Sequence, residues 1–254
     1  MPESAGGTGI GAVVLAAGAG RRMGHRPKSL LERDGEPLLL RQVRLLAQAG
    51  CARIVVVLGH HRQALLRVLE PAQARYPSLT WVTNPKPEED PATSLAYGLR
   101  ALPPDTVTLL VALGDQPLLQ EGDAQAVLHA WRTRQDKVHL VVPVHGGEPG
   151  HPLAFGAVLR AAVQGGASVR AWRRAHPDQV AQLAAEHARY TTDVDTPEAL
   201  ERFAHEHGVR LAWPACPHGH PGLGDTKPPL GHNGPLLTRR FAPLAGALQV
   251  LLKT

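Results

Sequence analysis

The hydrophobic residues of the chain follow two alternating patterns. Short, uninterrupted apolar runs occupy 12–16, 54–59 and 106–113, and such runs are typical of strands that are buried on both faces of a sheet. Between the first two runs, apolar residues in 38–49 recur at the spacing of one helix face. The same patterns predict further helices over 63–69, 93–101, 123–134, 157–163, 169–175 and 196–207, and further strands over 79–83 and 138–144. This alternation predicts an α/β domain, in which a mostly parallel, Rossmann-like sheet carries helices on both faces.

The composition changes after residue 208. Prolines and glycines recur throughout 209–254 and interrupt any long periodic element. We therefore expect one domain over 10–208, followed by a poorly ordered tail over 209–254 that is rich in Pro, Gly and His. Cys216, His218 and His220 could supply part of a zinc site in this tail, but the four-ligand spacing of a structural zinc site is not completed nearby. A solvated linker is the simpler interpretation.

Composition and charge narrow the class of protein. With 43% hydrophobic residues over 254 positions, the chain can bury a large core. The net charge of +5 suggests an anionic partner, but the arginines are scattered and only 4% of the residues are aromatic, so we expect no nucleic-acid partner. A small anionic substrate, or a general excess of arginine without a function, accounts for the charge. Two cysteines, and no apolar run long enough for a bilayer, predict a cytoplasmic protein without a membrane segment.

The first predicted strand ends in a glycine-rich segment with basic residues. Positions 15–24 read L-A-A-G-A-G-R-R-M-G, and Lys28 follows shortly after. Glycines let backbone N–H groups approach an anion closely, and Arg22 and Lys28 add positive charge. The segment therefore predicts a phosphate site of the size of a triphosphate.

Spacing distinguishes this segment from two common phosphate-binding loops. A dinucleotide-binding G-x-G-x-x-G would have glycine or alanine at Met23 and an acidic residue after the second strand, where the chain instead has Gly59 and two histidines. A P-loop would have lysine directly after its last glycine, whereas Lys28 lies four residues beyond Gly24. Neither NAD binding nor a P-loop is expected.

A carboxylate follows the strand predicted over 106–113. Asp115 stands at the carboxyl end of this buried strand, where open α/β sheets bind their ligands. Mg²⁺ favours one or two carboxylates together with phosphate oxygens of the substrate. Asp115 is therefore a candidate metal ligand, and the plainer alternative is an aspartate that caps a turn.

Two aspartates precede the last predicted helix. Either Asp195 or Thr196 can serve as its N-cap, because a side-chain oxygen at this position accepts a hydrogen bond from the first turn. Asp193 lies ahead of the cap and can point toward a crevice as a second metal or substrate ligand. We expect Asp195 to be mainly structural and Asp193 to contribute to the site.

The glycine-rich segment and the aspartate motifs resemble the signature of the MobA-like nucleotidyltransferases, and within them the molybdenum cofactor cytidylyltransferases. The matching positions of the first motif are Leu15, Ala16, Ala17, Gly18, Gly20, Arg22, Met23, Gly24 and Lys28. G-D-Q-P around Asp115 and D-V-D-T-P-E-A-L over 193–200 match further motifs of the family. The resemblance spans residues 10–207 and implies a fold of the nucleotide-diphospho-sugar transferase type.

The resemblance also implies which residues bind the nucleotide. These are Leu15, Ala16, Ala17, Gly18, Ala19, Gly20, Arg22, Lys28, Thr93 and Ser94. The last two begin a helix in a family motif, and they can equally be ordinary N-caps. Arg22, Lys28 and Asp115 would be the catalytic residues, and Asp115 and Asp193 would hold Mg²⁺.

His151 and Asp195 are the candidates for contact with the second substrate. His151 belongs to a G-H-P segment that the family places near this substrate, often after a basic residue. Here Glu148 and Pro149 precede it, so the segment does not show what recognises the phosphate of the second substrate.

The implied reaction joins CTP to a pterin. The phosphate of molybdenum-loaded molybdopterin attacks the α-phosphorus of CTP, which releases pyrophosphate and forms molybdopterin cytosine dinucleotide. By resemblance, Ala17 goes with cytidylyl transfer, whereas glycine in its place goes with guanylyl transfer. CTP, the pterin and a client molybdenum hydroxylase are the implied partners, and Mg²⁺ is the implied cofactor. Three alternatives stay open: a guanylyltransferase acting on the same pterin, a cytidylyltransferase acting on a sugar or isoprenoid phosphate, and a non-catalytic chaperone for the pterin cofactor.

Overall fold

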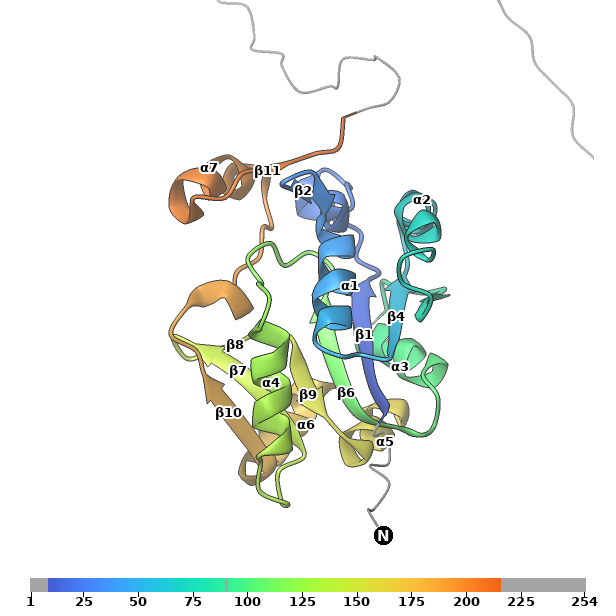
Figure 1. Ribbon diagram of the computed structural model, residues 1–254, viewed down its shortest axis with the longest axis vertical. Helices are drawn as coiled ribbons and strands as arrows, with labels where there is room; N and C mark the ends of the chain where they lie inside the picture. Colours follow the sequence, from blue (N-terminus) through green and yellow to red (C-terminus); the bar gives the residue numbers. More distant parts are fainter. Residues whose placement is uncertain (1–8, 90, 216–254) are drawn as a thin grey trace, which may run out of the picture. The chain divides into compact units, whose positions relative to one another are not determined.

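The main sheet is built from eight strands in the computed structural model, which describes residues 9–89 and 91–215. Their order is β10-β7-β9-β6-β1-β4-β5, and β8 pairs with β7 (Figure 1). The strands are β1 (Gly9–Ala16), β4 (Arg53–Leu58), β5 (Leu79–Thr83), β6 (Thr106–Leu113), β7 (Leu140–His145), β8 (Glu148–Pro149), β9 (Leu153–Phe155) and β10 (Val180–Ala184). β8 and β9 are antiparallel to the strands they pair with, and the other pairs are parallel. This confirms the mostly parallel α/β sheet.

Helices cover both faces of this sheet, and the side chains of β1 show how. Ala12 and Val14 pack into one core cluster with residues of α1, α2 and α4, whereas Val13 packs into a second cluster with residues of α3, α5 and α6. The helices are α1 (Leu38–Gln48), α2 (Arg62–Ala72), α3 (Pro91–Ala101), α4 (Asp123–Arg132), α5 (Ala157–Gln164), α6 (Val169–Ala175) and α7 (Pro197–His207), with 3-10 turns at Arg21–Met23, Lys28–Leu30, Pro177–Gln179 and Ala188–Tyr190. Because both faces are covered, the central strands are apolar at nearly every position.

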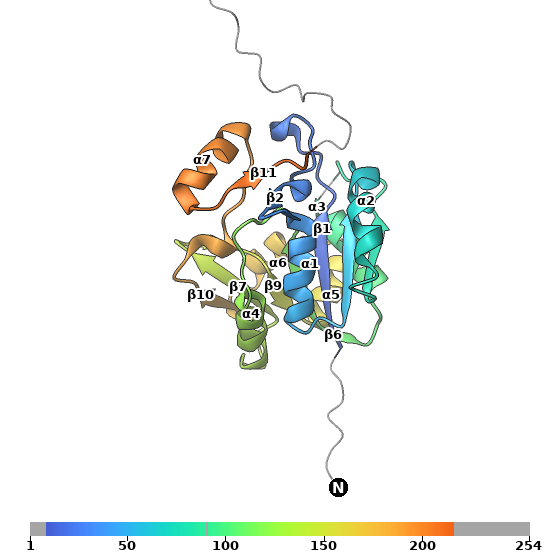
Figure 2. The ribbon, with the colours of Figure 1, turned by 45° about the horizontal axis from the view of Figure 1, so that its top comes forward.

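A small second sheet lies near α7, beyond the end of β1 (Figure 2). It pairs β11 (Leu211–Ala212), β2 (Glu32–Arg33) and β3 (Glu36–Pro37) in antiparallel fashion. Leu211 packs with Met23 and Phe203 in a third apolar cluster. Residues 209–215, expected in the tail, therefore continue the compact unit, which extends to Ala215. Cys216, His218 and His220 lie outside the described residues.

The strand patterns missed β9 and β10. β9 is only three residues long and follows the His151-Pro152 turn, so it is too short for a recognisable period. β10 pairs only with β7 and is partly exposed. Its alternation of apolar and polar residues is weak because two of its five residues are small alanines. Within residues 9–89 and 91–215, no helix is both long enough and apolar enough to span a bilayer.

The core around β9 generates a stability prediction. Phe155 is completely buried between β6 and β7, where it joins the cluster that contains Leu109 and Leu140. Phe155→Ala removes most of this buried surface and leaves a cavity, so the free energy of unfolding is expected to fall by about 3–5 kcal/mol. Urea denaturation followed by circular dichroism measures this loss.

Val158→Ala is the matched control, because Val158 lies on the neighbouring helix α5 but is 49% exposed. Its effect should stay within about 0.5 kcal/mol. Equal midpoints for the two variants would contradict the placement of Phe155 in the core.

Candidate active site

The glycine-rich segment forms a tight loop directly after β1. The carbonyl of Gly20 accepts hydrogen bonds from the backbone N–H groups of Met23 and His25, at 2.9 and 3.0 Å. Gly20 has a φ of +61°, and a Cβ at this position would lie 2.0 Å from the carbonyl oxygen of Arg26. Only glycine therefore fits the turn. Met23 is buried in the cluster with Leu31, which fixes the loop to the body of the domain.

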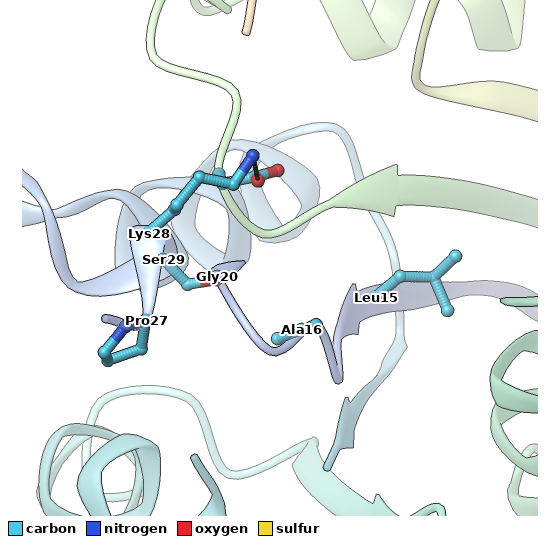
Figure 3. Close-up of a pocket in the computed structure, with 8 residues that line it drawn as sticks. Leu15, Ala16, Gly20, Pro27, Lys28 and Ser29 are labelled. Atoms are coloured by element: carbon cyan, nitrogen blue, oxygen red, sulfur yellow. Dashed lines mark ion pairs between the residues drawn. The ribbon is translucent and has the colours of Figure 1, made fainter. Parts of the chain in front are cut away.

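A small cavity of about 60 Å³ opens between this loop and the end of β6. Its lining consists of Leu15, Ala16, Gly18, Gly20, Pro27, Lys28, Ser29 and Asp115. Figure 3 shows Lys28 reaching across the cavity to a carboxylate, with a dashed line for the ion pair. The structure thus brings most of the predicted phosphate loop and the predicted metal aspartate to one place.

Hydrogen bonds between the strand ends explain why Asp115 faces the loop. β1 and β6 pair in parallel up to Leu15, and the backbone N–H of Gly114 donates to the carbonyl of Leu15 at 2.9 Å. Asp115 is the next residue, so its side chain emerges beside the loop. Gln116 is buried and donates from Nε2 to the carbonyl of Tyr190 at 2.7 Å, while Gln42 donates to the carbonyl of Gln116 at 2.7 Å. These amides hold the turn after β6 in position.

Two cations and two carboxylates form an ion cluster at the cavity. The Nζ of Lys28 lies 2.8 Å from Oδ2 of Asp115 and 2.7 Å from Oδ1 of Asp195. Arg22 pairs with the other carboxylate oxygen of Asp195. The Lys28 side chain is 19% exposed, whereas that of Arg22 is 68% exposed. Lys28 is therefore the fixed centre of the cluster, and Arg22 extends from it into solvent.

The cluster changes the acidity of its members. Burial alone lowers the pKa of Lys28, but Asp115 and Asp195 outweigh it, so this pKa is raised and the ammonium is charged at neutral pH. Burial raises the pKa of Asp195, but Lys28 and Arg22 outweigh it, and this pKa is lowered. The residue Asp193 is exposed, yet partial burial of its carboxyl and then the charge of Asp195 raise its pKa. Asp193 thus lies within electrostatic reach of the cluster, although it makes no ion pair there.

The structure corrects the role expected for Asp195. Thr196 is the N-cap of α7, because its Oγ1 accepts a hydrogen bond from the backbone N–H of Ala199 at 3.2 Å. The Asp195 side chain instead points to Lys28 and Arg22. Thr196 and not Asp195 is therefore the cap, and a local capping pattern does not reveal that Asp195 has a partner 167 positions away in sequence. A contact of Asp195 with substrate stays a prediction.

Thr93 and Ser94 lie in the first turns of α3, away from the lining of the loop cavity. Asn84 donates from Nδ2 to the hydroxyl oxygens of both residues, at 3.0 and 2.9 Å. Asn84 and Ser94 are both buried. Sequence reasoning missed Asn84, whose only local signal is its position just after a strand.

His151 stands between Asp115 and a second, larger cavity. Its backbone N–H donates to the carbonyl of Tyr190 at 2.9 Å, and His151 lines this cavity together with Arg173. Burial lowers the pKa of His151 to about 4, and Asp115 offsets only part of this effect. The imidazole is therefore neutral near pH 7.

The described residues contain no group of three or more His, Cys, Asp or Glu arranged to hold a metal ion. Mg²⁺ does not need such a cage, because it commonly uses one or two carboxylates together with substrate phosphates. The carboxylate of Asp115, at the wall of the cavity, is suited to that mode of binding.

The fold and the charged cavity define the class of protein. A mostly parallel sheet with helices on both sides is the architecture of nucleotidyltransferases with the nucleotide-diphospho-sugar transferase fold. Residues 12–183 match the model of the MobA-like NTP transferase domain. The chain belongs to this family and is a nucleotidyltransferase.

Proteins that are similar to this chain carry names for different activities. The nicotine blue oxidoreductase of Paenarthrobacter nicotinovorans is 30% identical over 198 residues, which cover 75% of this chain and 94% of that protein. A "Probable molybdenum cofactor guanylyltransferase" of Synechococcus elongatus is 37% identical over 128 residues, 48% of this chain and 56% of the relative. Among solved structures, Rv0371c of Mycobacterium tuberculosis in complex with manganese is 25% identical, with a TM-score of 0.61 over 78% of this chain and 99% of the other.

The two roles at the start of α7 generate a prediction. Thr196→Ala removes the N-cap, so it should lower the free energy of unfolding by about 1 kcal/mol with little effect on turnover. Asp195→Asn keeps the shape but removes the charge that orients Lys28 and Arg22. We expect it to slow pyrophosphate release at least about tenfold, which corresponds to roughly 1.4 kcal/mol of barrier.

Urea denaturation and a pyrophosphate assay on both variants separate the two roles. The lowered pKa of Asp195 stabilises the fold above its ordinary value of 3.8, and this stabilisation is lost as the pH falls through the folded pKa. Asp195→Asn should therefore also weaken the acid dependence of stability. A Thr196→Ala variant with the larger catalytic loss would reverse the two assignments.

Proposed function

We propose that the protein transfers CMP from CTP to the phosphate of molybdenum-loaded molybdopterin in the cytoplasm and releases pyrophosphate. The observation that carries this proposal is the cavity at the end of β1, where a glycine-rich loop, Lys28 and Asp115 meet. A nucleoside triphosphate needs backbone N–H groups and cations, and a metal that accompanies it needs a carboxylate. The domain expected over 10–208, together with its extension to Ala215, would carry the activity.

The triphosphate would bind along the loop. Residues 17–20 offer backbone N–H groups, and Lys28 stands at the cavity wall. Arg22 is largely exposed, so its guanidinium can turn from Asp195 to a phosphate at little cost. Lys28 can keep one carboxylate partner while it exchanges the other for a phosphate oxygen.

The reaction itself needs alignment and charge neutralisation more than covalent help. An oxygen of the acceptor phosphate forms a bond to the α-phosphorus, and the bond from that phosphorus to the bridging oxygen breaks, so pyrophosphate leaves with the electron pair. Lys28 and Arg22 neutralise the charge that develops on the leaving group. No proton has to move, because the attacking phosphate oxygen is already deprotonated at neutral pH.

Mg²⁺ fits the carboxylates available at the cavity. Asp115 would be its main protein ligand, and Asp193 would be the second. When bound, the metal supplies further neutralisation of the phosphate charges. The manganese complex of the mycobacterial relative supports a divalent metal in this family.

Hydride transfer is the rival activity suggested by the name of the Paenarthrobacter relative. Two features of this chain favour nucleotidyl transfer instead. Met23 occupies the third glycine position of a dinucleotide fingerprint, where it is buried in the third cluster. The strand β4 ends before Gly59 and His60, with no acidic residue to hold a ribose.

The choice of acceptor substrate and the choice of nucleobase both rest on resemblance to the family. Guanylyl transfer to the same pterin is the second candidate, because the Synechococcus relative carries that name. Cytidylyl transfer is preferred here because alanine stands at position 17. A molybdenum hydroxylase that receives the finished cofactor is the proposed client.

Pyrophosphate release tests the proposal directly. The protein is incubated with each of the four nucleoside triphosphates, with and without molybdenum-loaded molybdopterin, and we expect release only with CTP and pterin together. Lys28→Ala and Asp115→Asn should each lower the rate at least about tenfold. Arg67→Ala, at an exposed residue of α2, is the control and should leave the rate unchanged. Full activity of both site variants, or release with sugar phosphates instead of pterin, would refute the proposal.

A substitution at position 17 tests the choice of base. Ala17 is 7% exposed and packs with Leu95 and Ala96, so Ala17→Gly opens only a methyl-sized space at the start of the loop. Such a change is worth about 1–3 kcal/mol of discrimination. We expect a clear preference for CTP in the native protein and a partial gain of GTP use in the variant. Competitive turnover with both nucleotides measures this, and a native preference for GTP would assign the protein to guanylyl transfer.

A further inference from the structure

A second cavity of about 480 Å³ has among its lining residues His151, which lies within electrostatic reach of Asp115 in the candidate active site. It lies between the end of β7, the turn that carries β8 and His151, and the helix α6. Val142, Leu153 and Val169 give it apolar walls. A hollow of this size and mixed polarity is typical of a small-molecule site.

Three arginines of α6 make this cavity strongly basic. Arg170, Arg173 and Arg174 all line it, and Glu148 is its only acidic lining residue. Arg173 also lines an adjoining hollow with Gln182, so it stands where the two spaces meet. Within residues 9–89 and 91–215, none of the three guanidinium groups has a hydrogen bond or an ion pair.

The packing of α6 directs these arginines into the cavity. Trp172 is buried and stacks on His176, with ring centroids 4.6 Å apart, which anchors the opposite side of the short helix. Arg170 and Arg173 are three positions apart and therefore lie on one face of α6. An anion in the cavity would be attracted by all three arginines that line it.

His151 connects this cavity to the reacting centre. This residue lines the second cavity, and its buried imidazole lies within electrostatic reach of Asp115 in the first. The ring is neutral at physiological pH, so it cannot supply the charge needed to hold an anionic acceptor. That charge has to come from another element.

We propose that Arg170 and Arg173 bind the negative charge of the acceptor substrate in this cavity, and so select a phosphorylated acceptor. The inference rests on the proposed nucleotidyl transfer. It also accounts for the absence of a basic residue before the G-H-P segment, because α6 brings arginines to the cavity from a different part of the chain.

The test compares two double variants. Arg170→Ala/Arg173→Ala removes the proposed anion site, and Arg62→Ala/Arg67→Ala removes two exposed arginines of α2 that line neither cavity. With molybdenum-loaded molybdopterin as acceptor and CTP at saturation, the first variant should raise the KM for the acceptor at least about tenfold, equivalent to roughly 1.4 kcal/mol. The KM for CTP should change less than about twofold in both variants. An unchanged acceptor KM in the first variant, or an equal rise in the second, would overturn the inference.

A binding measurement separates this inference from the proposed function. Inorganic phosphate is titrated calorimetrically into protein saturated with a non-hydrolysable CTP analogue, so that the nucleotide site is blocked. The native protein and the α2 variant should bind phosphate, and the α6 variant should not. If no acceptor is turned over but this difference is observed, the proposed reaction fails and the anion site stands. If the native protein binds no phosphate, or the α6 variant binds it equally well, the anion site fails.

Discussion

The ammonium of Lys28 holds together parts of the chain that are remote in sequence. Asp115 follows a central strand, Asp195 precedes the last helix, and both lie within 2.8 Å of the same nitrogen. Two carboxylates that contact the same nitrogen would repel each other strongly if the cation between them were absent. The lysine therefore makes it possible for the start of α7 and the end of β6 to approach each other, so the loop cavity and the local fold depend on the same charge.

The backbone provides the frame for this interaction. Because β1 and β6 are parallel and in register, the loop after β1 and the turn after β6 emerge at the same edge of the sheet. The hydrogen bond from Gly114 to Leu15 extends this register beyond the last pair of strand residues. Gly20 then turns the chain where no side chain would fit. Short-range geometry thus positions the loop, and a long-range ion pair closes the site around it.

The sequence was sufficient to predict the features that depend on residues close together in the chain. Continuous apolar runs predicted the central strands, because strands covered on both faces need apolar residues at every position. The glycine spacing predicted the loop, and an aspartate at a strand end predicted the acidic wall of the cavity. β11 was missed because two residues have no period, and the tail boundary was displaced with it. Asn84, the pairing of Asp195 with Lys28, and the α6 arginines were missed for a different reason: each depends on side chains that meet only after folding.

The loop after β1 and the arginines of α6 differ in how firmly the rest of the fold holds them. The glycine-rich loop is tied to the core through Met23 and through the backbone of β1, so a change there disturbs packing as well as the loop cavity. The arginines of α6 are different, because Arg170 and Arg174 are exposed and, in the part of the chain that the structure describes, none of the three pairs with a carboxylate. Trp172 and Val169 anchor the helix in the second cluster. The lining of the second cavity can therefore change by substitution on one short helix while the loop cavity stays intact, which would let one fold serve different substrates.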